Sequence, residues 1–341
     1  MPFTAPNADI EFGVYSLTDM NAPETAARRI QDIVDYGVAA DQLGLNVFGV
    51  GEHHTSRFVV SSPAVVLAAI AARTSSITLA SAVSVLSVLD PVRLYQDFAQ
   101  LDLVSGGRAE ITVGRSAYAE PFDIFGVDGA RYDEVFAEKL DLLRVLTTEE
   151  VVTWEGRFRP PLDRATVIPR LGRTLPARVG VGGSLESAGR AGRVGLPMTL
   201  AHLGGSVARA KPAVDLYWSS AEAAGHPLST LGVGLASHVY VGGTSQGARE
   251  RFYPHYRSYF AAGRGTHLDR STFDAMAGPD GALLVGNAQE IAEKLTVQHQ
   301  LLGASRFIGL IDLGGLPRTD VLKSIERFAN GVAPAVRGSS G

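Results

Sequence analysis

The sequence predicts an α/β fold of the (β/α)8 class, a TIM barrel, and three observations carry this prediction. Short β-rich runs alternate with longer runs of helical periodicity, which is the pattern of parallel βα units. Eight strands can be counted, a number that a doubly wound open sheet leaves unexplained. The chain has 341 residues, 45% of them hydrophobic, which is enough to bury a large core.

The predicted strands are short runs rich in β-branched and other apolar residues. Because each is followed by a helical pattern, we expect them to lie parallel in one sheet. The predicted strands span residues 10–15, 47–50, 77–85, 109–113, 178–181, 198–202, 232–241 and 307–313.

The segments between the strands show helical spacing of apolar residues. In the first, Ile33 and Val34 fall on one face, and Gly44 ends the helix. The third begins at Asp90 and Pro91, which supply an N-cap and a first-turn proline. The predicted helices span residues 24–43, 63–73, 91–104, 131–146, 185–193, 207–224, 246–260, 288–301 and 319–329.

Two segments depart from the repeating unit. Residues 151–159 are predicted to form a small hairpin with its turn at Glu155-Gly156. Residues 261–281 are polar and weakly periodic, which predicts a lid-like insertion after strand seven. We therefore expect one barrel domain over residues 1–336, followed by a flexible tail over residues 337–341.

Composition excludes several classes of function. The chain has no cysteine, which excludes disulfides, thiolate metal sites and a cysteine nucleophile. A net charge of −4 argues against general nucleic-acid binding. No apolar run is long enough for a membrane span, so a cytoplasmic protein is the default expectation. No metal site is predicted, because the adjacent His53 and His54 lack a third ligand at metal spacing.

One short catalytic motif is present between a predicted strand and a predicted helix. Gly243-Thr244-Ser245-Gln246-Gly247 matches the GxSxG nucleophile elbow, so a serine hydrolase using Ser245 is one hypothesis. The other interpretation is a helix N-cap region rich in small polar residues. The P-loop and HExxH patterns are absent from the sequence.

Candidate catalytic and binding residues follow three of the predicted strands, where a barrel carries its chemistry. His53 and His54 follow the second strand, and imidazole suits proton transfer near neutral pH. Arg115 follows the fourth strand and is suited to gripping a phosphate. Ser184 and Ser187 open a helix after the fifth strand, where free N–H groups attract anions.

Each of these clusters also has a purely structural interpretation. The histidines could be bonded to the backbone, the arginine tied to a carboxylate at the barrel rim, and the serine a plain N-cap. Only their joint occurrence favours a ligand site.

The third predicted strand ends in an apolar segment that contains Ala82, Val83 and Ser84. A flat aromatic ring held against it, with its phosphate reaching the guanidinium and the serine-tipped helix, would be a flavin mononucleotide (FMN) site. Gly114 and Gly183 leave room for a ligand beside the backbone. Expected substrate-contacting residues are Tyr15, Phe58, Tyr118 and His202.

Read together, these segments resemble the luciferase-like flavin monooxygenases, the family that includes bacterial luciferase. The resemblance runs from about residue 11 to residue 336, and it rests on the order and spacing of short motifs. The motifs are Gly51-Glu52-His53-His54, Ser62-Pro63-Ala64, Asp90-Pro91-Val92-Arg93, LDLVSGGR at 101–108, Gly114-Arg115, Gly195-Leu196-Pro197-Met198 and Gly286.

The resemblance implies a barrel that binds reduced FMN at the carboxyl ends of its strands. His53 looks like the catalytic histidine of the family, with His54 as its neighbour in the same motif. Ala82 and Val83 match a non-prolyl cis peptide under the flavin ring. The phosphate-binding positions are matched by Arg115, Ser184, Ser187 and the backbone of Gly183.

The implied reaction is oxygenation of a small organic substrate by O2 through a flavin peroxide, with reduced FMN supplied by a separate reductase. The resemblance also implies a homodimer formed through helices two and three, and a mobile lid at residues 261–281. Gly114 stands where bacterial luciferase has a reactive cysteine. Two alternatives keep the fold: hydride transfer with the deazaflavin F420, and a non-catalytic flavin-binding subunit.

Overall fold

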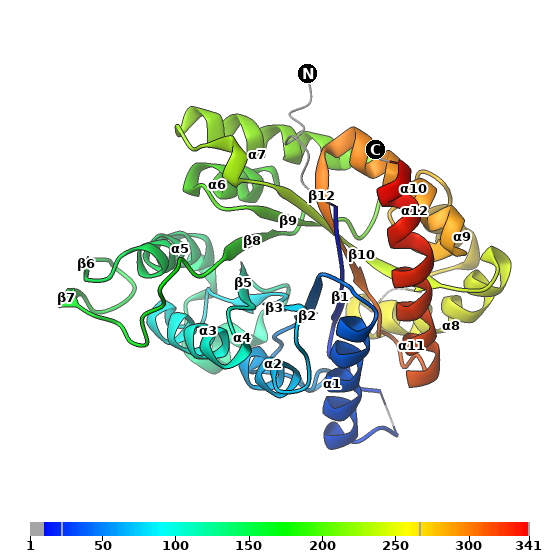
Figure 1. Cartoon of the computed structure of the whole chain (residues 1–341), viewed down its shortest axis with the longest axis horizontal. Helices are drawn as coiled ribbons and strands as arrows, with labels where there is room; N and C mark the ends of the chain where they lie inside the picture. Colours follow the sequence, from blue (N-terminus) through cyan, green and yellow to red (C-terminus); the bar gives the residue numbers. More distant parts are fainter. Residues whose placement is uncertain (1–9, 22, 266, 340–341) are drawn as a thin grey trace.

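The computed structural model describes residues 10–21, 23–265 and 267–339. Eight parallel strands close into a barrel, because β10 pairs with β12 on one side and with β9 on the other (Figure 1). The predicted barrel is therefore confirmed. Its strands, in order around the ring, are β1 (Glu11–Ser16), β2 (Val47–Val50), β3 (Thr78–Ser81), β5 (Ala109–Gly114), β8 (Ala177–Val181), β9 (Met198–Ala201), β10 (Val233–Val241) and β12 (Ala304–Leu310).

The helices cover the outside of the barrel and bury their apolar faces against it (Figure 1). Among the described residues, no helix has both the length and the apolarity that a membrane crossing needs. The helices are α1 (Ala26–Gln42), α2 (Pro63–Ala71), α3 (Pro91–Ser105), α4 (Glu120–Phe125), α5 (Tyr132–Thr148), α6 (Leu185–Val194), α7 (Lys211–Ala223), α8 (Ser245–Arg264), α9 (Arg270–Ala277), α10 (Ala288–Leu302), α11 (Arg318–Arg327) and α12 (Ala333–Ser339).

Local sequence explains where the helices begin and end. The Asp90 carboxylate accepts the N–H groups of Val92 and Arg93 at the start of α3, as predicted. Gly106 ends that helix with φ of 72°, a left-handed conformation that glycine adopts without steric cost.

The third predicted strand is interrupted in the structure. Residues 77–85 form β3 and a separate short strand, β4 (Ser84–Val85), which pairs with β5. The interruption lies at the peptide bond between Ala82 and Val83, which is cis. The implied non-prolyl cis peptide is therefore present.

The two predicted excursions also differ from expectation. The hairpin consists of β6 (Val152–Trp154) and β7 (Leu162–Ala165), so its loop is longer than a turn at Glu155-Gly156. Residues 261–281 hold the end of α8 and the whole of α9, because Asp269 caps a new helix by accepting the Thr272 N–H. A short parallel strand that the sequence did not reveal, β11 (Leu284–Gly286), follows and pairs with β10.

The predicted tail begins inside a helix. Residues 337–339 belong to α12, and Arg337 donates to the carbonyl of Ile10 and to Asn46 Oδ1. Residues 340–341 lie outside the described residues, and the flexible tail stays a prediction.

Charged side chains fill the barrel near the amino ends of its strands. The Arg306 guanidinium lies 2.6 Å from Glu110 Oε1 and 2.6 Å from Glu11 Oε2. Arg178 adds a second buried cation, whose pKa is lowered to about 10 by burial and then by the repulsion of Arg306. We call these four residues the barrel floor.

We expect Arg306→Leu to lower the free energy of unfolding by about 3 kcal/mol or more, because it leaves the buried Glu110 carboxylate without its main partner. Glu11→Gln removes a half-exposed partner of the same arginine and should cost less than about 1 kcal/mol. Urea denaturation of both variants tests this. Equal losses of unfolding free energy in the two variants would show that the barrel floor does not act as a buried ion cluster.

Candidate active site

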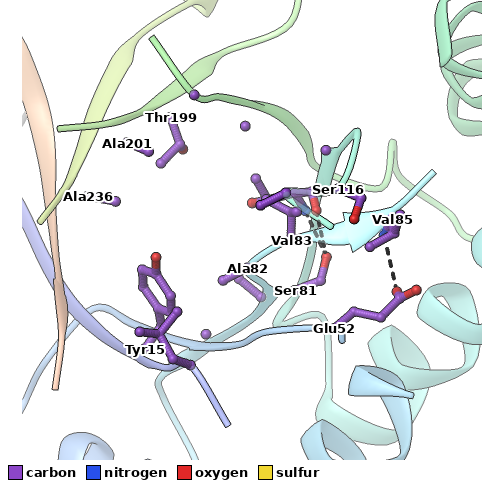
Figure 2. Close-up of a pocket in the computed structure, with 18 of the residues that line it drawn as sticks. Tyr15, Glu52, Ser81, Ala82, Val83, Val85, Ser116, Thr199, Ala201 and Ala236 are labelled. Carbon is purple, nitrogen blue, oxygen red and sulfur yellow. Dashed lines mark hydrogen bonds between the residues drawn. The ribbon is translucent and has the colours of Figure 1, made fainter. Parts of the chain in front are cut away.

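A cavity of about 280 Å³ lies inside the barrel at the carboxyl ends of the strands. Its wall is built mainly from small residues, and Figure 2 shows Ala82, Ala201 and Ala236 around the open space. Barrels of this class usually fill their interior with branched side chains. Glycine and alanine at the inward positions leave this one hollow, which makes room for a ligand.

Two glycines shape the wall beside the cis peptide. A Cβ atom added at Gly114 would lie 2.5 Å from Val83 Cγ2, and one added at Gly180 would lie 2.7 Å from Val83 Cγ1. Glycine at both positions therefore lets the Val83 side chain pack against β5 and β8. Ala82, Val83 and Gly114, three of the predicted cofactor-binding residues, all line the cavity.

Ser84 was predicted to contact the cofactor, but it is not among the residues that line the cavity. Val83 and Val85 both line it. Because neighbouring side chains along an extended chain point to opposite sides, Ser84 faces away, where it is buried.

His53 is the histidine that lines the cavity. Its ring stacks on Phe58 with 3.7 Å between ring centroids, and Tyr118 lies edge-on at 5.8 Å. Burial, followed by the nearby charges of His54 and Arg57, lowers the pKa of His53 to about 3. The imidazole is therefore uncharged at neutral pH, with Nδ1 3.4 Å from the Thr18 hydroxyl.

His54 has a different environment. Its Nε2 lies 2.8 Å from Glu52 Oε1, its ring meets Phe125 edge-on, and it is not among the cavity-lining residues. Glu52 Oε2 in turn accepts the Val85 N–H, a bond drawn in Figure 2. Of the two predicted catalytic histidines, only His53 lines the cavity, whereas His54 lies outside the lining and binds the Glu52 carboxylate.

Glu52 itself lines the cavity, although the prediction did not include it as a site residue. The available signal was an acidic residue at a strand end beside two histidines. Thr112 and Thr199 also line the cavity, with Arg178 Nε donating to Thr199 Oγ1. No motif marks these two threonines, because they occupy ordinary inward strand positions.

Arg115 lines the cavity at its rim and is held by a carboxylate. Its Nη1 lies 2.5 Å from Asp133 Oδ1 and 3.3 Å from the Tyr132 hydroxyl. The structural interpretation of this arginine is therefore realised in the structure. It does not exclude phosphate binding, because a guanidinium carries five donors.

The predicted anion-binding helix is α6. The Ser184 hydroxyl caps it by accepting the Ser187 N–H, so the N-cap interpretation is realised, and the two hydroxyls lie 3.0 Å apart. Gly183 has φ of 95°, which favours glycine. These three residues do not line the cavity; Gly182, just before them, does.

The expected substrate-contacting residues fall into two groups. Tyr15 and Tyr118 line the cavity, whereas Phe58 is not among the lining residues and stacks on His53, which is. His202 is buried outside the lining, and burial followed by the Lys294 charge lowers its pKa. Burial also keeps the pKa of Tyr15 well above its ordinary value, so its phenol stays protonated.

Ser245 lies at the start of α8, away from the residues that line the cavity. Its hydroxyl accepts the Asn287 N–H, and Thr244 caps the helix by accepting the Gly247 N–H. The N-cap interpretation of the GxSxG segment is therefore the one that the structure realises.

Comparisons with known proteins agree with this geometry. The family described as luciferase-like monooxygenase matches residues 10–305. A 4-hydroxyprotoasukamycin monooxygenase from Streptomyces nodosus subsp. asukaensis is 29% identical over 88% of this chain and 85% of its own. An F420-dependent glucose-6-phosphate dehydrogenase from Kribbella flavida is 31% identical over 48% of this chain and 51% of its own. The crystal structure of monooxygenase RslO1 from Streptomyces bottropensis has a TM-score of 0.84 at 23% identity, covering 95% and 99% of the two chains.

The lowered pKa of His53 predicts a pH dependence of stability. Between its ordinary value of 6.5 and about 3, the unfolded chain binds more protons at this residue than the folded chain does. The free energy of unfolding should therefore fall as pH drops through this range. We expect His53→Asn to lose this part of the slope, measured by urea denaturation between about pH 7 and pH 4.

His267→Asn is the matched control, because His267 is exposed. It should keep the slope of the unsubstituted chain. An unchanged slope in His53→Asn would show that His53 is not held uncharged by burial.

Proposed function

Because the chain belongs to the luciferase-like monooxygenase family, we propose that it uses reduced FMN and O2 to oxygenate a small organic substrate. The observation that carries this proposal is the hollow barrel end, where an uncharged imidazole lines the same cavity as the cis peptide and an arginine. A separate reductase would supply the reduced flavin.

The residues present fit a flat, phosphorylated cofactor. Ala82, Val83 and Gly114 form a smooth apolar wall on which an isoalloxazine ring can lie. A Cβ atom added at Gly182 would meet no atom within 4 Å, so the backbone is open to a ligand there. Arg115 stands at the rim, where it can donate to a phosphate.

The serine-capped start of α6 completes the proposed phosphate site. The Ser184 and Ser187 hydroxyls and the Gly183 backbone supply neutral donors, and the helix dipole favours an anion at this end. When bound, reduced FMN supplies the electrons that activate O2.

His53 is the residue that we assign to proton transfer. Since burial keeps its ring uncharged, one nitrogen can accept a proton while the other already carries one. The stack with Phe58 fixes the plane of the ring, so the proton moves at a defined position in the cavity. The apolar wall keeps bulk water away from this position.

Glu52 acts as a positioning residue in this proposal. Its two carboxylate oxygens bind His54 and the Val85 N–H, which joins the loop carrying His53 to β4. The wall beside the cis peptide and the catalytic loop are therefore held together by one buried carboxylate.

The second candidate is hydride transfer with F420 on the same fold. The monooxygenase relative matches most of this chain and the F420-dependent dehydrogenase about half of it, which supports FMN. A non-catalytic flavin-binding subunit gives no reason for an uncharged histidine in the cavity.

We also propose that two copies pair through α2 and α3. Val65 of α2 and Leu103 and Val104 of α3 expose 59–70% of their surface, and the two helices contact each other. Light scattering of the purified protein tests the pairing.

Anaerobic titration with reduced FMN and with reduced F420 tests the cofactor. We expect saturable binding of FMN and weaker binding of F420. The reverse order would favour hydride transfer, and binding of neither would overturn both candidates.

We expect His53→Ala to retain FMN binding but to lower product formation by about 100-fold or more, which is the usual loss on removing a general acid or base. Product analysis with a panel of aldehydes and ketones measures this. His267→Ala, which removes an exposed imidazole, should leave the rate unchanged. Unchanged turnover in His53→Ala would remove His53 from the mechanism.

A further inference from the structure

One carboxylate oxygen at the cavity rim serves two arginines from different parts of the chain. Asp133 Oδ1 lies 2.5 Å from Arg115 Nη1 and 3.2 Å from Arg190 Nη2. Arg115 follows β5, Asp133 lies in the first turn of α5, and Arg190 lies in α6. We call these three residues the rim cluster.

The rim cluster extends the proposed phosphate site by a second cation. Arg190 lies three residues after Ser187, so the two share a face of the helix that Ser184 caps. Only 8% of Arg190 is exposed, and its Nη1 has no hydrogen-bond partner among the described residues. A buried guanidinium with an unused donor is costly unless a further acceptor binds there.

Asp133 is the least confined member of the cluster. Its side chain is 39% exposed, whereas those of Arg115 and Arg190 are 21% and 10% exposed. Each arginine has other contacts: Arg115 with the Tyr132 hydroxyl and ring, and Arg190 with Glu186 and the Phe136 ring. The arginines can therefore keep their places when the carboxylate moves into solvent.

The Asp133 carboxylate balances positive charge in the rim cluster. Burial alone would raise the pKa of Asp133, but hydrogen bonds from Arg115 and Arg190 outweigh it and lower the pKa, so the group is ionised at neutral pH. With Asp133 and Glu186 both negative, the two guanidinium charges are already neutralised. A ligand phosphate approaching them would be repelled by Asp133 unless that side chain moved away.

We propose that Asp133 is an internal anion that the cofactor phosphate replaces between Arg115 and Arg190, which makes Arg190 a second phosphate-binding residue. This inference rests on the proposed function, because it takes the ligand to be a phosphorylated flavin. A phosphate offers more oxygens to the two guanidinium groups than the one carboxylate oxygen that they share. Asp133 thereby sets how strongly the site prefers a phosphorylated ligand over an unphosphorylated one.

The test compares FMN with riboflavin, which has the same ring but no phosphate. We expect Asp133→Asn to bind FMN about tenfold more tightly than the unsubstituted chain does, because a competing negative charge is gone. Its affinity for riboflavin should not change. Quenching of flavin fluorescence during titration measures both affinities.

Glu134→Gln is the matched control. Glu134 lies next to Asp133 in the same turn but pairs with Arg131 and Arg157, both outside the rim cluster. This substitution changes the net charge by the same amount, so it should leave both affinities unchanged. Equal tightening in both variants would mean that net charge alone is responsible, and would overturn the exchange.

Arg190→Gln tests the second cation. We expect FMN binding to weaken about tenfold while riboflavin binding stays the same. Arg193→Gln removes an exposed arginine of the same helix and should change neither. A uniform loss for both flavins in Arg190→Gln would mean that Arg190 only supports the fold.

The results distinguish a failure of this inference from a failure of the proposed function. If the unsubstituted chain binds no FMN, the proposed function fails and the exchange fails with it. If it prefers FMN to riboflavin but Asp133→Asn binds FMN equally or more weakly, Asp133 only positions the arginines and the exchange alone is overturned. Asp133→Ser provides a second variant, and thermal melting of each variant verifies that it folds.

Discussion

The site depends on one steric constraint: Gly49, Gly114 and Gly180, which line the cavity close to the cis peptide, have no room for a side chain. A Cβ atom at Gly49 would lie 2.8 Å from Tyr15 Cβ and 2.9 Å from Ala82 Cβ, and one at Gly114 or Gly180 would lie even closer to the Val83 side chain. These glycines let the chain on either side of the cis peptide approach β2, β5 and β8. A methyl group at any of them would push the wall into the cavity or out of the sheet.

Because this barrel is hollow at the carboxyl ends of its strands, fewer side chains pack inside it there. Other parts of the fold must therefore supply the stability of the protein. The outer shell of helices supplies an apolar core that is continuous around the barrel. The barrel floor closes the other end with Arg306 between two carboxylates. The ion cluster therefore lies at the amino ends of the strands, and the cavity lies at their carboxyl ends.

The strands and the position of His53 were predictable from the sequence because both depend on local pattern. Alternation of βα units fixed the barrel, and position after a strand placed His53 at its mouth. The directions of neighbouring side chains were not predictable: His54 turns behind the wall to Glu52, and Ser84 faces away. Asp133 was also missed, because its role appears only when α5 is packed beside β5 and α6.

The acidic residue and the basic residue that line the cavity are paired in the same way. Among the described residues that line it, Glu52 is the carboxylate and Arg115 the guanidinium, and each pairs with a residue outside the lining, Glu52 with His54 and Arg115 with Asp133. The nearby charges of His54 and Arg57 repel a proton on His53 and so lower its pKa further. Burial and this repulsion act in the same direction. The His53 ring, which lines the cavity, is therefore uncharged, and the neighbouring His54 pairs with the Glu52 carboxylate.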